Sequence, residues 1–276
     1  MHINQFEYPT LEAAWEGINE YLVNNEEKVK AAGGANYSTE LVLYDSFIHV
    51  YKAWISDKFN FGKTLGYRYK KWSKLINNYV DFNYLDLVKS EVNGREKRKS
   101  AHYTFTFHFD NSHGSGKDCL ISLTFCRRKG QENPIVIYNT RASEVTSRMI
   151  FDFLLIQRIC EYVYGKERTV EVICQIPFMF VNIERFLIYM AYKGRNCIKL
   201  GKGQKQFTDY QNKCLDKYDK FLNTPLDNIK YKVHKRAAIQ VQNKIDHIPD
   251  LYAKELTFPF NKKIKLKDIE KLDKSL

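Results

Sequence analysis

The sequence predicts an α/β protein with a large mixed β-sheet backed by helices, and three observations support this fold class. The chain has 276 residues, of which 44% are hydrophobic and 14% aromatic, so it can bury a substantial core. Its middle part contains three successive strand-like segments rich in β-branched and aromatic residues. A long apolar helix, a further strand and another helix follow. We expect residues 1–207 to form this domain, and residues 208–276 to form a basic, mostly helical C-terminal extension.

The N-terminal third of the chain shows a helix followed by a strand. Residues 10–30 place apolar side chains at helical spacing, and Thr10 is suited to cap the start of this helix. Residues 40–54 have the β-branched and aromatic content of one strand or a strand pair. Residues 60–75 indicate a glycine-containing, basic and aromatic loop that enters a helix. The pattern over residues 76–92 favours neither a helix nor a strand.

The middle of the chain predicts three strands, which cover residues 100–109, 119–128 and 134–140. Residues 144–165 then predict a long helix, and Gly165 is well placed to end it.

The remaining residues add a strand, a helix and the extension. Residues 170–181 predict a strand, and residues 183–194 predict a helix. Residues 208–276 contain fifteen Lys and Arg against ten Asp and Glu and indicate further helices.

The charge balance favours anionic partners. The formal net charge is +12, from 44 Lys and Arg against 32 Asp and Glu. Nucleotides, nucleic acid and phosphate-bearing substrates fit such a balance, and a solvated lysine-rich surface explains it equally well. No apolar run approaches the roughly 20 residues of a membrane span, and the N-terminus lacks a signal-peptide pattern. We therefore expect a cytoplasmic protein with no membrane partner.

The six cysteines are scattered singly along the chain without a Cys-x-x-Cys pair. This spacing argues against a disulfide framework and against a structural zinc site. His108 and His113 lie near Cys119 in sequence, but two histidines and one cysteine make an incomplete zinc site. We expect no metal.

Three residues carry the chemistry that the sequence suggests: Cys119 at the start of a strand, Arg141 at the end of the next, and Asp152 on the following helix. Asp152 stands inside the apolar run IFDFLLI. It is therefore either buried with a partner or paired on the surface with Arg148, one helical turn earlier.

These spacings resemble the thymidylate synthase and deoxycytidylate hydroxymethylase superfamily over about residues 8–195. Members place a nucleophilic cysteine at a strand start, then an Arg-Ser-x-Asp motif, then an Asn or Asp that contacts the base. Here Arg141 follows Cys119 by 22 residues within Arg-Ala-Ser-Glu, and Asp152 follows Arg141 by eleven. The family places Asn opposite uracil and Asp opposite cytosine, so the resemblance implies that dCMP is favoured over dUMP.

The resemblance also implies roles for individual residues. Cys119 would add to C6 of the pyrimidine, which makes C5 nucleophilic toward a one-carbon donor, a tetrahydrofolate derivative. Glu144 would stand where the motif's acid lies near the folate. The 5′-phosphate would be bound by four residues, which are Arg141, Ser143, Arg98 and Lys99. The family also implies a homodimer.

The chain departs from the family at three places. One is the family's Pro-Cys-His signature, which is replaced here by Asp118-Cys119-Leu120. Phe178 and Phe180 stand where the family has a His and a Tyr that hold the sugar, and the helix with the catalytic glutamate is shortened or absent between residues 50 and 65. These departures favour a second hypothesis, a non-catalytic homologue that binds nucleotide or nucleic acid. A third hypothesis is a DNA- or RNA-binding protein, since residues 63–74 interleave basic and aromatic side chains.

Overall fold

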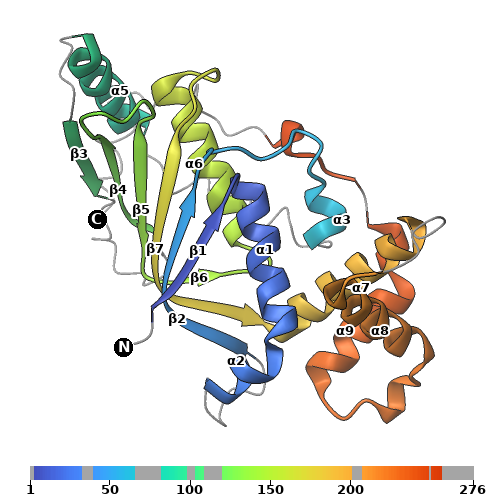
Figure 1. Ribbon diagram of the computed structural model, residues 1–276. Helices are drawn as coiled ribbons and strands as arrows, with labels where there is room; N and C mark the ends of the chain where they lie inside the picture. The colour runs from blue at the N-terminus through green and yellow to red at the C-terminus, as the bar shows by residue number, and fades with distance from the viewer. Residues whose placement is uncertain are drawn as a thin grey trace, which may run out of the picture.

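The computed structural model describes residues 3–32, 40–65, 82–97, 103–108, 120–200, 207–248 and 250–256. Within these residues, seven strands form one mixed sheet with the order β1-β2-β7-β5-β4-β3, and the short β6 also pairs with β7 (Figure 1). The strands are β1 (Asn4–Tyr8), β2 (Glu40–Val50), β3 (Tyr103–His108), β4 (Leu120–Arg127), β5 (Ile135–Thr140), β6 (Ser143–Glu144) and β7 (Glu171–Asn182). The predicted α/β architecture with a large mixed sheet is confirmed.

Helices pack beside this sheet and continue beyond it in the chain (Figure 1). They are α1 (Leu11–Asn24), α2 (Glu26–Ala32), α3 (Phe61–Leu65), α5 (Phe82–Lys97), α6 (Met149–Tyr164), α7 (Ile183–Leu200), α8 (Asp209–Asn223) and α9 (Lys232–Asn243). Three short 3-10 turns follow α8 and α9, namely η1 (Leu226–Asn228), η2 (Ile245–His247) and η3 (Ala253–Glu255). The mostly helical character predicted for the extension is confirmed for the part of it that the structure describes.

Helix α6 is the centre of the fold. Eleven of its 16 residues are buried, because it packs between the sheet, α1 and α5. Strands β5 and β7 are parallel, so the chain must cross from one to the other, and α6 makes this crossing. Gly165 ends the helix with a φ of 91°, a backbone conformation that glycine adopts without strain, as the sequence predicts.

The predicted N-terminal helix is interrupted. Thr10 caps α1 as expected, since its side chain accepts from the Ala13 N–H at 3.1 Å. The helix then breaks at Asn25, whose backbone N–H and side-chain amide both donate to the Tyr21 carbonyl at 2.9 Å. An asparagine side chain competes in this way for backbone groups, and so α2 starts as a separate helix at Glu26.

The long helix predicted over residues 144–165 starts later than expected. Ser143 and Glu144 pair with Met179 and Phe180 of β7 instead, which makes them the two-residue strand β6. Helix α6 therefore begins only at Met149. Helix α5 begins within residues 76–92, where the sequence pattern favours neither a helix nor a strand. Strand β1 was not predicted from the sequence.

The two central strands change face halfway along their length. In β2 the core-facing side chains have odd residue numbers up to Leu43 and even numbers from Ile48 on. In β7 they have even numbers up to Ile176 and odd numbers from Met179 on, so the alternation shifts by one residue in both strands. Asp45 lies at the switch in β2 with a φ of 49°, and it is the only non-glycine residue with positive φ in the described part of the chain. The paired strands bend together at this point.

The C-terminal helices share the core of the sheet domain. Cys214 and Phe221 of α8 and Ala237 of α9 are buried in the same hydrophobic cluster as the residues of α6. Helix α7 brings them there by packing against both α8 and α9. Helix α7 lies so close to α8 at Gly194 that a Cβ atom at this position would collide with the backbone carbonyl of Cys214.

A pair of glycine substitutions tests this packing. Gly194→Ala should lower the free energy of unfolding by about 1–3 kcal/mol, because the carbonyl of Cys214 belongs to a helix backbone and cannot move aside. Gly94→Ala in α5 is the matched control: no atom lies within 4 Å of the added Cβ. It should raise that free energy by about 0.5–1 kcal/mol. Urea unfolding measures both, and a Gly194→Ala protein as stable as the parent would contradict the described α7–α8 contact.

Candidate functional site

A cluster of polar side chains lies where β5 ends and α6 begins. Asp152, in the first turn of α6, accepts a hydrogen bond from the side chain of Tyr138 in β5. Tyr138 is buried on the core side of the sheet and pairs with Cys174 of β7. Asp152 therefore faces the sheet. Of the two arrangements expected from the sequence, burial with a partner is the one observed.

The environment of Asp152 changes its acidity. Burial raises the pKa of its carboxyl group from 3.8 to about 7, and the negative charge of Glu144 adds to this rise. The positive charge of Arg148 and the hydrogen bond from Tyr138 oppose it without cancelling it. Near neutral pH this carboxyl group is thus populated in both its protonated and its ionised form, which is the state that proton transfer or base recognition requires.

Glu144 is the second carboxyl group of the cluster and is only 4% exposed. Its Oε2 accepts from the Ser147 N–H at 2.9 Å and from the Ser147 hydroxyl. Burial raises the pKa of Glu144, while Ser147 and the charges of Arg185 and Arg148 lower it, with burial the largest effect. Its other oxygen, Oε1, is buried without a hydrogen-bond partner.

Two serine hydroxyls of the sheet are also buried without a partner. They are Ser46 Oγ in β2 and Ser143 Oγ in β6. Strand pairing places Ser46 opposite Ile176 and Ser143 opposite Met179, so both hydroxyls flank the bend in β7. Buried polar atoms without a partner are rare in folded proteins, and a water molecule or a ligand commonly supplies the missing hydrogen bond.

The structure brings together part of the predicted site. Asp152 and Glu144 belong to one electrostatic cluster, since the charge of Glu144 acts on Asp152. Arg141 lies directly after β5 and is exposed. The positive charges that act on the two carboxyl groups are those of Arg148 and Arg185.

Three predicted site residues, Cys119, Arg98 and Lys99, lie outside the described residues. Their assignment as nucleophile and phosphate ligands therefore stays a prediction. The neighbouring residue Leu120 opens β4 and pairs with Thr140, the residue before Arg141.

Three residues of the cluster were not predicted from the sequence: Tyr138, Ser147 and Arg185. Tyr138 carried the clearest signal, because a tyrosine at a core-facing position of a strand needs a partner for its hydroxyl group. Arg185 gave no signal, since its approach to Glu144 depends on how α7 packs against the sheet.

The two phenylalanines that depart from the family pattern form part of an aromatic group. The rings of Phe178 and Phe180 stack with their centroids 5.7 Å apart, and the ring of Tyr44 lies 5.7 Å from that of Phe178. Neither phenylalanine has a polar atom that could hold a sugar hydroxyl group.

Two further properties of the described residues bear on function. They contain no group of three or more His, Cys, Asp or Glu side chains placed to hold a metal ion. None of their helices combines the length and the apolar character that crossing a bilayer requires.

Comparison with known proteins adds no assignment for this site. No protein-family model matches the chain, and no curated protein matches it.

The raised pKa of Asp152 predicts a specific dependence of stability on pH. Between about pH 4 and pH 7 the folded protein keeps the Asp152 proton, whereas the unfolded chain has lost it. The free energy of unfolding should therefore fall as the pH rises through this window, and this contribution should be constant above it. Each pH unit corresponds to at most about 1.4 kcal/mol. The partial exposure of Asp152 reduces the total to about 1–3 kcal/mol.

Asp152→Asn removes this titration, so the variant should gain stability over the parent protein at pH 8 and little at pH 4. Asp227→Asn, at a side chain that is 98% exposed, is the matched control and should show no such change with pH. Urea unfolding at several pH values measures both variants. Equal pH profiles for the parent protein and Asp152→Asn would show that Asp152 is ionised like an ordinary surface aspartate.

Proposed function

We propose that the protein is a pyrimidine deoxynucleotide C5 methyl- or hydroxymethyltransferase that favours dCMP over dUMP. The observation that carries this proposal is the sheet-facing carboxyl group of Asp152, whose pKa is raised to about 7. It lies on the helix position at which the resembling family contacts the base. Glu144, whose charge acts on Asp152, has an unpartnered buried oxygen that a bound ligand would satisfy.

The chemistry of cytosine explains the preference. Cytosine presents a basic ring nitrogen, N3, next to an amino group, and uracil presents an N–H next to a carbonyl oxygen. A protonated Asp152 can donate to N3 and accept from the amino group. Transfer of the proton to N3 would turn this contact into a two-point, charge-assisted pair, which uracil cannot form because its oxygen is a much weaker base.

The reaction requires a nucleophile, and Cys119 is the proposed one. Its thiolate would form a bond to C6, and the electron pair released at C5 would attack the one-carbon donor. Loss of the C5 proton and cleavage of the bond between the one-carbon unit and the donor nitrogen would leave a methylene group on C5 of the base. Addition of water would give the hydroxymethyl product, or addition of a hydride from tetrahydrofolate the methyl product, and expulsion of the thiolate would restore the ring. Arg141, Ser143, Arg98 and Lys99 remain the proposed ligands of the 5′-phosphate.

A tetrahydrofolate derivative would supply the one-carbon unit at the oxidation level of formaldehyde. Glu144 fits such a group, because its Oε1 is a buried acceptor without a donor and the pterin ring carries N–H donors. Glu144 would hold and orient that ring at the end of β6.

The second candidate function is that of a non-catalytic homologue that binds a nucleotide or a nucleic acid. The stacked Phe178 and Phe180 favour it, because they replace the hydrogen-bonding residues that the family uses to hold the sugar.

The outer face of the sheet supports a homodimer. On this face Phe47 and Tyr51 of the β2 region are 40% and 47% exposed, and Tyr44 beyond the bend is 50% exposed. The surrounding polar groups already pair with one another, as in the His49–Glu171 contact at 3.1 Å. A second copy of the chain would bury these aromatic rings without leaving the polar groups unsatisfied.

Tritium release from C5 of the base tests the enzymatic proposal. The parent protein should release tritium from [5-³H]dCMP faster than from [5-³H]dUMP when tetrahydrofolate and formaldehyde are present. Cys119→Ser should abolish the release, and Asp152→Asn should shift the preference toward dUMP. Asp227→Asn again serves as the control and should match the parent protein. If neither substrate releases tritium under any of these conditions, the transferase proposal is wrong and the second candidate takes its place.

The dimer is tested by sedimentation velocity. Phe47→Glu should convert the dimer into a monomer, because it places a charge at the centre of the proposed contact. Leu222→Glu is the matched control, since Leu222 of α8 is 47% exposed, close to the 40% of Phe47, but lies on a different surface. A parent protein that sediments as a monomer at micromolar concentration would rule out a stable dimer. A Phe47→Glu protein that remains dimeric would rule out this face of the sheet as the interface.

A further inference from the structure

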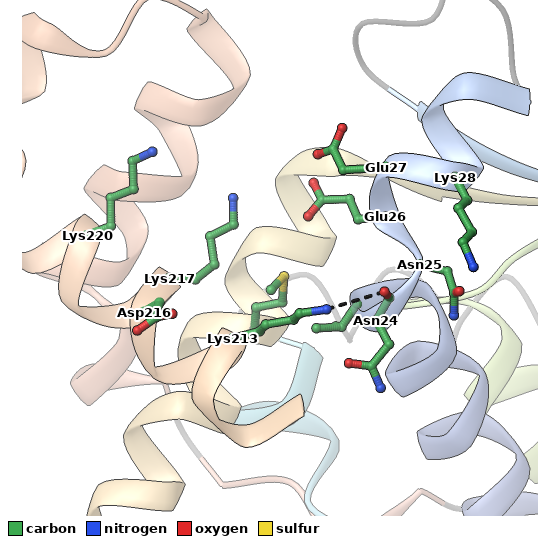
Figure 2. Close-up of a pocket in the computed structure, with 11 residues that line it drawn as sticks. Asn24, Asn25, Glu26, Glu27, Lys28, Lys213, Asp216, Lys217 and Lys220 are labelled. Carbon is green, nitrogen blue, oxygen red and sulfur yellow. Dashed lines mark hydrogen bonds between the residues drawn. The ribbon is translucent and has the colours of Figure 1, made fainter. Parts of the chain in front are cut away.

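A pocket of about 460 Å³ opens between the α1–α2 corner and helix α8 (Figure 2). This volume lies within the range of about 300–1,000 Å³ that is typical of small-molecule sites. None of the residues that line it belongs to the Asp152 cluster. It is therefore a separate candidate site.

One wall of the pocket is cationic. Lys213, Lys217 and Lys220 follow one another along α8 at spacings of four and three residues, which puts them on one face of the helix. Figure 2 shows them together on the side of the pocket that α8 forms. Lys213 also bridges the pocket, since its Nζ donates to the Asn24 carbonyl at 3.3 Å.

The opposite wall carries acceptors. Glu26 and Glu27 at the start of α2 line the pocket across from the α8 lysines, with the side-chain amides of Asn24 and Asn25 beside them (Figure 2). The buried side chains of Val23 and Met190 add apolar surface. Each wall also carries one group of the opposite sign, Asp216 on α8 and Lys28 on α2, so the α8 wall is net cationic and the α2 wall net anionic.

We propose that this pocket binds a phosphate ester with free hydroxyl groups, either a sugar phosphate or a nucleotide. The phosphate group would lie against the α8 lysines, which bind it as compact point charges. The hydroxyl groups would donate to Glu26 and Glu27, since an ionised carboxylate can only accept.

The same arrangement disfavours other ligands. Four lysines line the pocket against three carboxylates, so a cation meets net repulsion. The carboxylates of α2 repel a continuous phosphate backbone, which argues against DNA or RNA at this position.

Isothermal titration calorimetry with the full chain tests the proposal. Ribose 5-phosphate and adenosine 5′-monophosphate are the two probes, and they distinguish a sugar phosphate from a nucleotide by which of them binds more tightly. Both should bind about tenfold or more tightly than inorganic phosphate or unphosphorylated ribose, because each of these lacks one half of the contacts. Hydrogen exchange should slow at residues 23–28 and 213–220 when either probe is bound.

Paired variants separate the two walls. Lys217→Ala combined with Lys220→Ala should weaken both probes about tenfold or more. Lys232→Ala combined with Arg236→Ala removes the same charge from the exposed side of α9, and this control should have little effect. Glu26→Gln combined with Glu27→Gln removes the negative charges and leaves a weaker acceptor, so it should strengthen inorganic phosphate more than ribose 5-phosphate and narrow the difference between the two.

Three results would overturn the proposal: no binding of either probe, ribose bound as tightly as ribose 5-phosphate, or equal losses in the α8 and α9 variants. Asp152→Asn should leave binding in this pocket unchanged. A failure of the transferase proposal and a failure at this pocket are therefore told apart by separate measurements.

Discussion

The burial of α6 between the sheet, α1 and α5 is the constraint on which the rest of the structure depends. Eleven of the 16 residues of α6 are buried, and Asp152 lies on the side of the helix that faces the sheet, so its carboxyl group is stabilised by a partner from the sheet. The partner is Tyr138 of β5. Trp15 of α1 fixes the entry to the helix, because its indole N–H donates to the Val145 carbonyl at 2.9 Å and to the Thr146 carbonyl at 3.2 Å.

This arrangement stabilises the fold through its apolar contacts but places two carboxyl groups where ionisation is unfavourable. The core would be more stable if Asp152 and Glu144 were replaced by neutral residues of similar shape. Buried carboxyl groups with raised pKa values and unpartnered oxygen atoms are common at functional sites, where they bind a ligand. A purely structural polar cluster would be expected to pair all of its atoms, and Glu144 Oε1 has no pair.

Local sequence patterns predicted the strands β3, β4, β5 and β7, the apolar helix α6 and its end at Gly165, because alternation, apolar runs and glycine caps act over a few residues. They did not predict β6, since Ser143 and Glu144 form a strand only through pairing with β7. They also missed the break at Asn25, where the side-chain amide shares the Tyr21 carbonyl with the backbone N–H. In the site, the pattern singled out Asp152 and Glu144, but the approach of Arg185 depends on tertiary packing and had no local signal.

The placement of charge argues for small phosphorylated ligands over nucleic acid as partners of the described surface. A net charge of +12 fits either class, and so the positions of the charges decide. A nucleic-acid groove is continuously cationic, because it must neutralise a regular row of phosphates. In this protein the cations stand beside carboxylates at both candidate sites: Arg148 with Asp152 and Glu144, and the α8 lysines with the carboxylates of α2. A carboxylate next to a cation repels a polymer backbone but accepts hydrogen bonds from a base or a sugar, and this is the reason for proposing a compact phosphorylated ligand at each site.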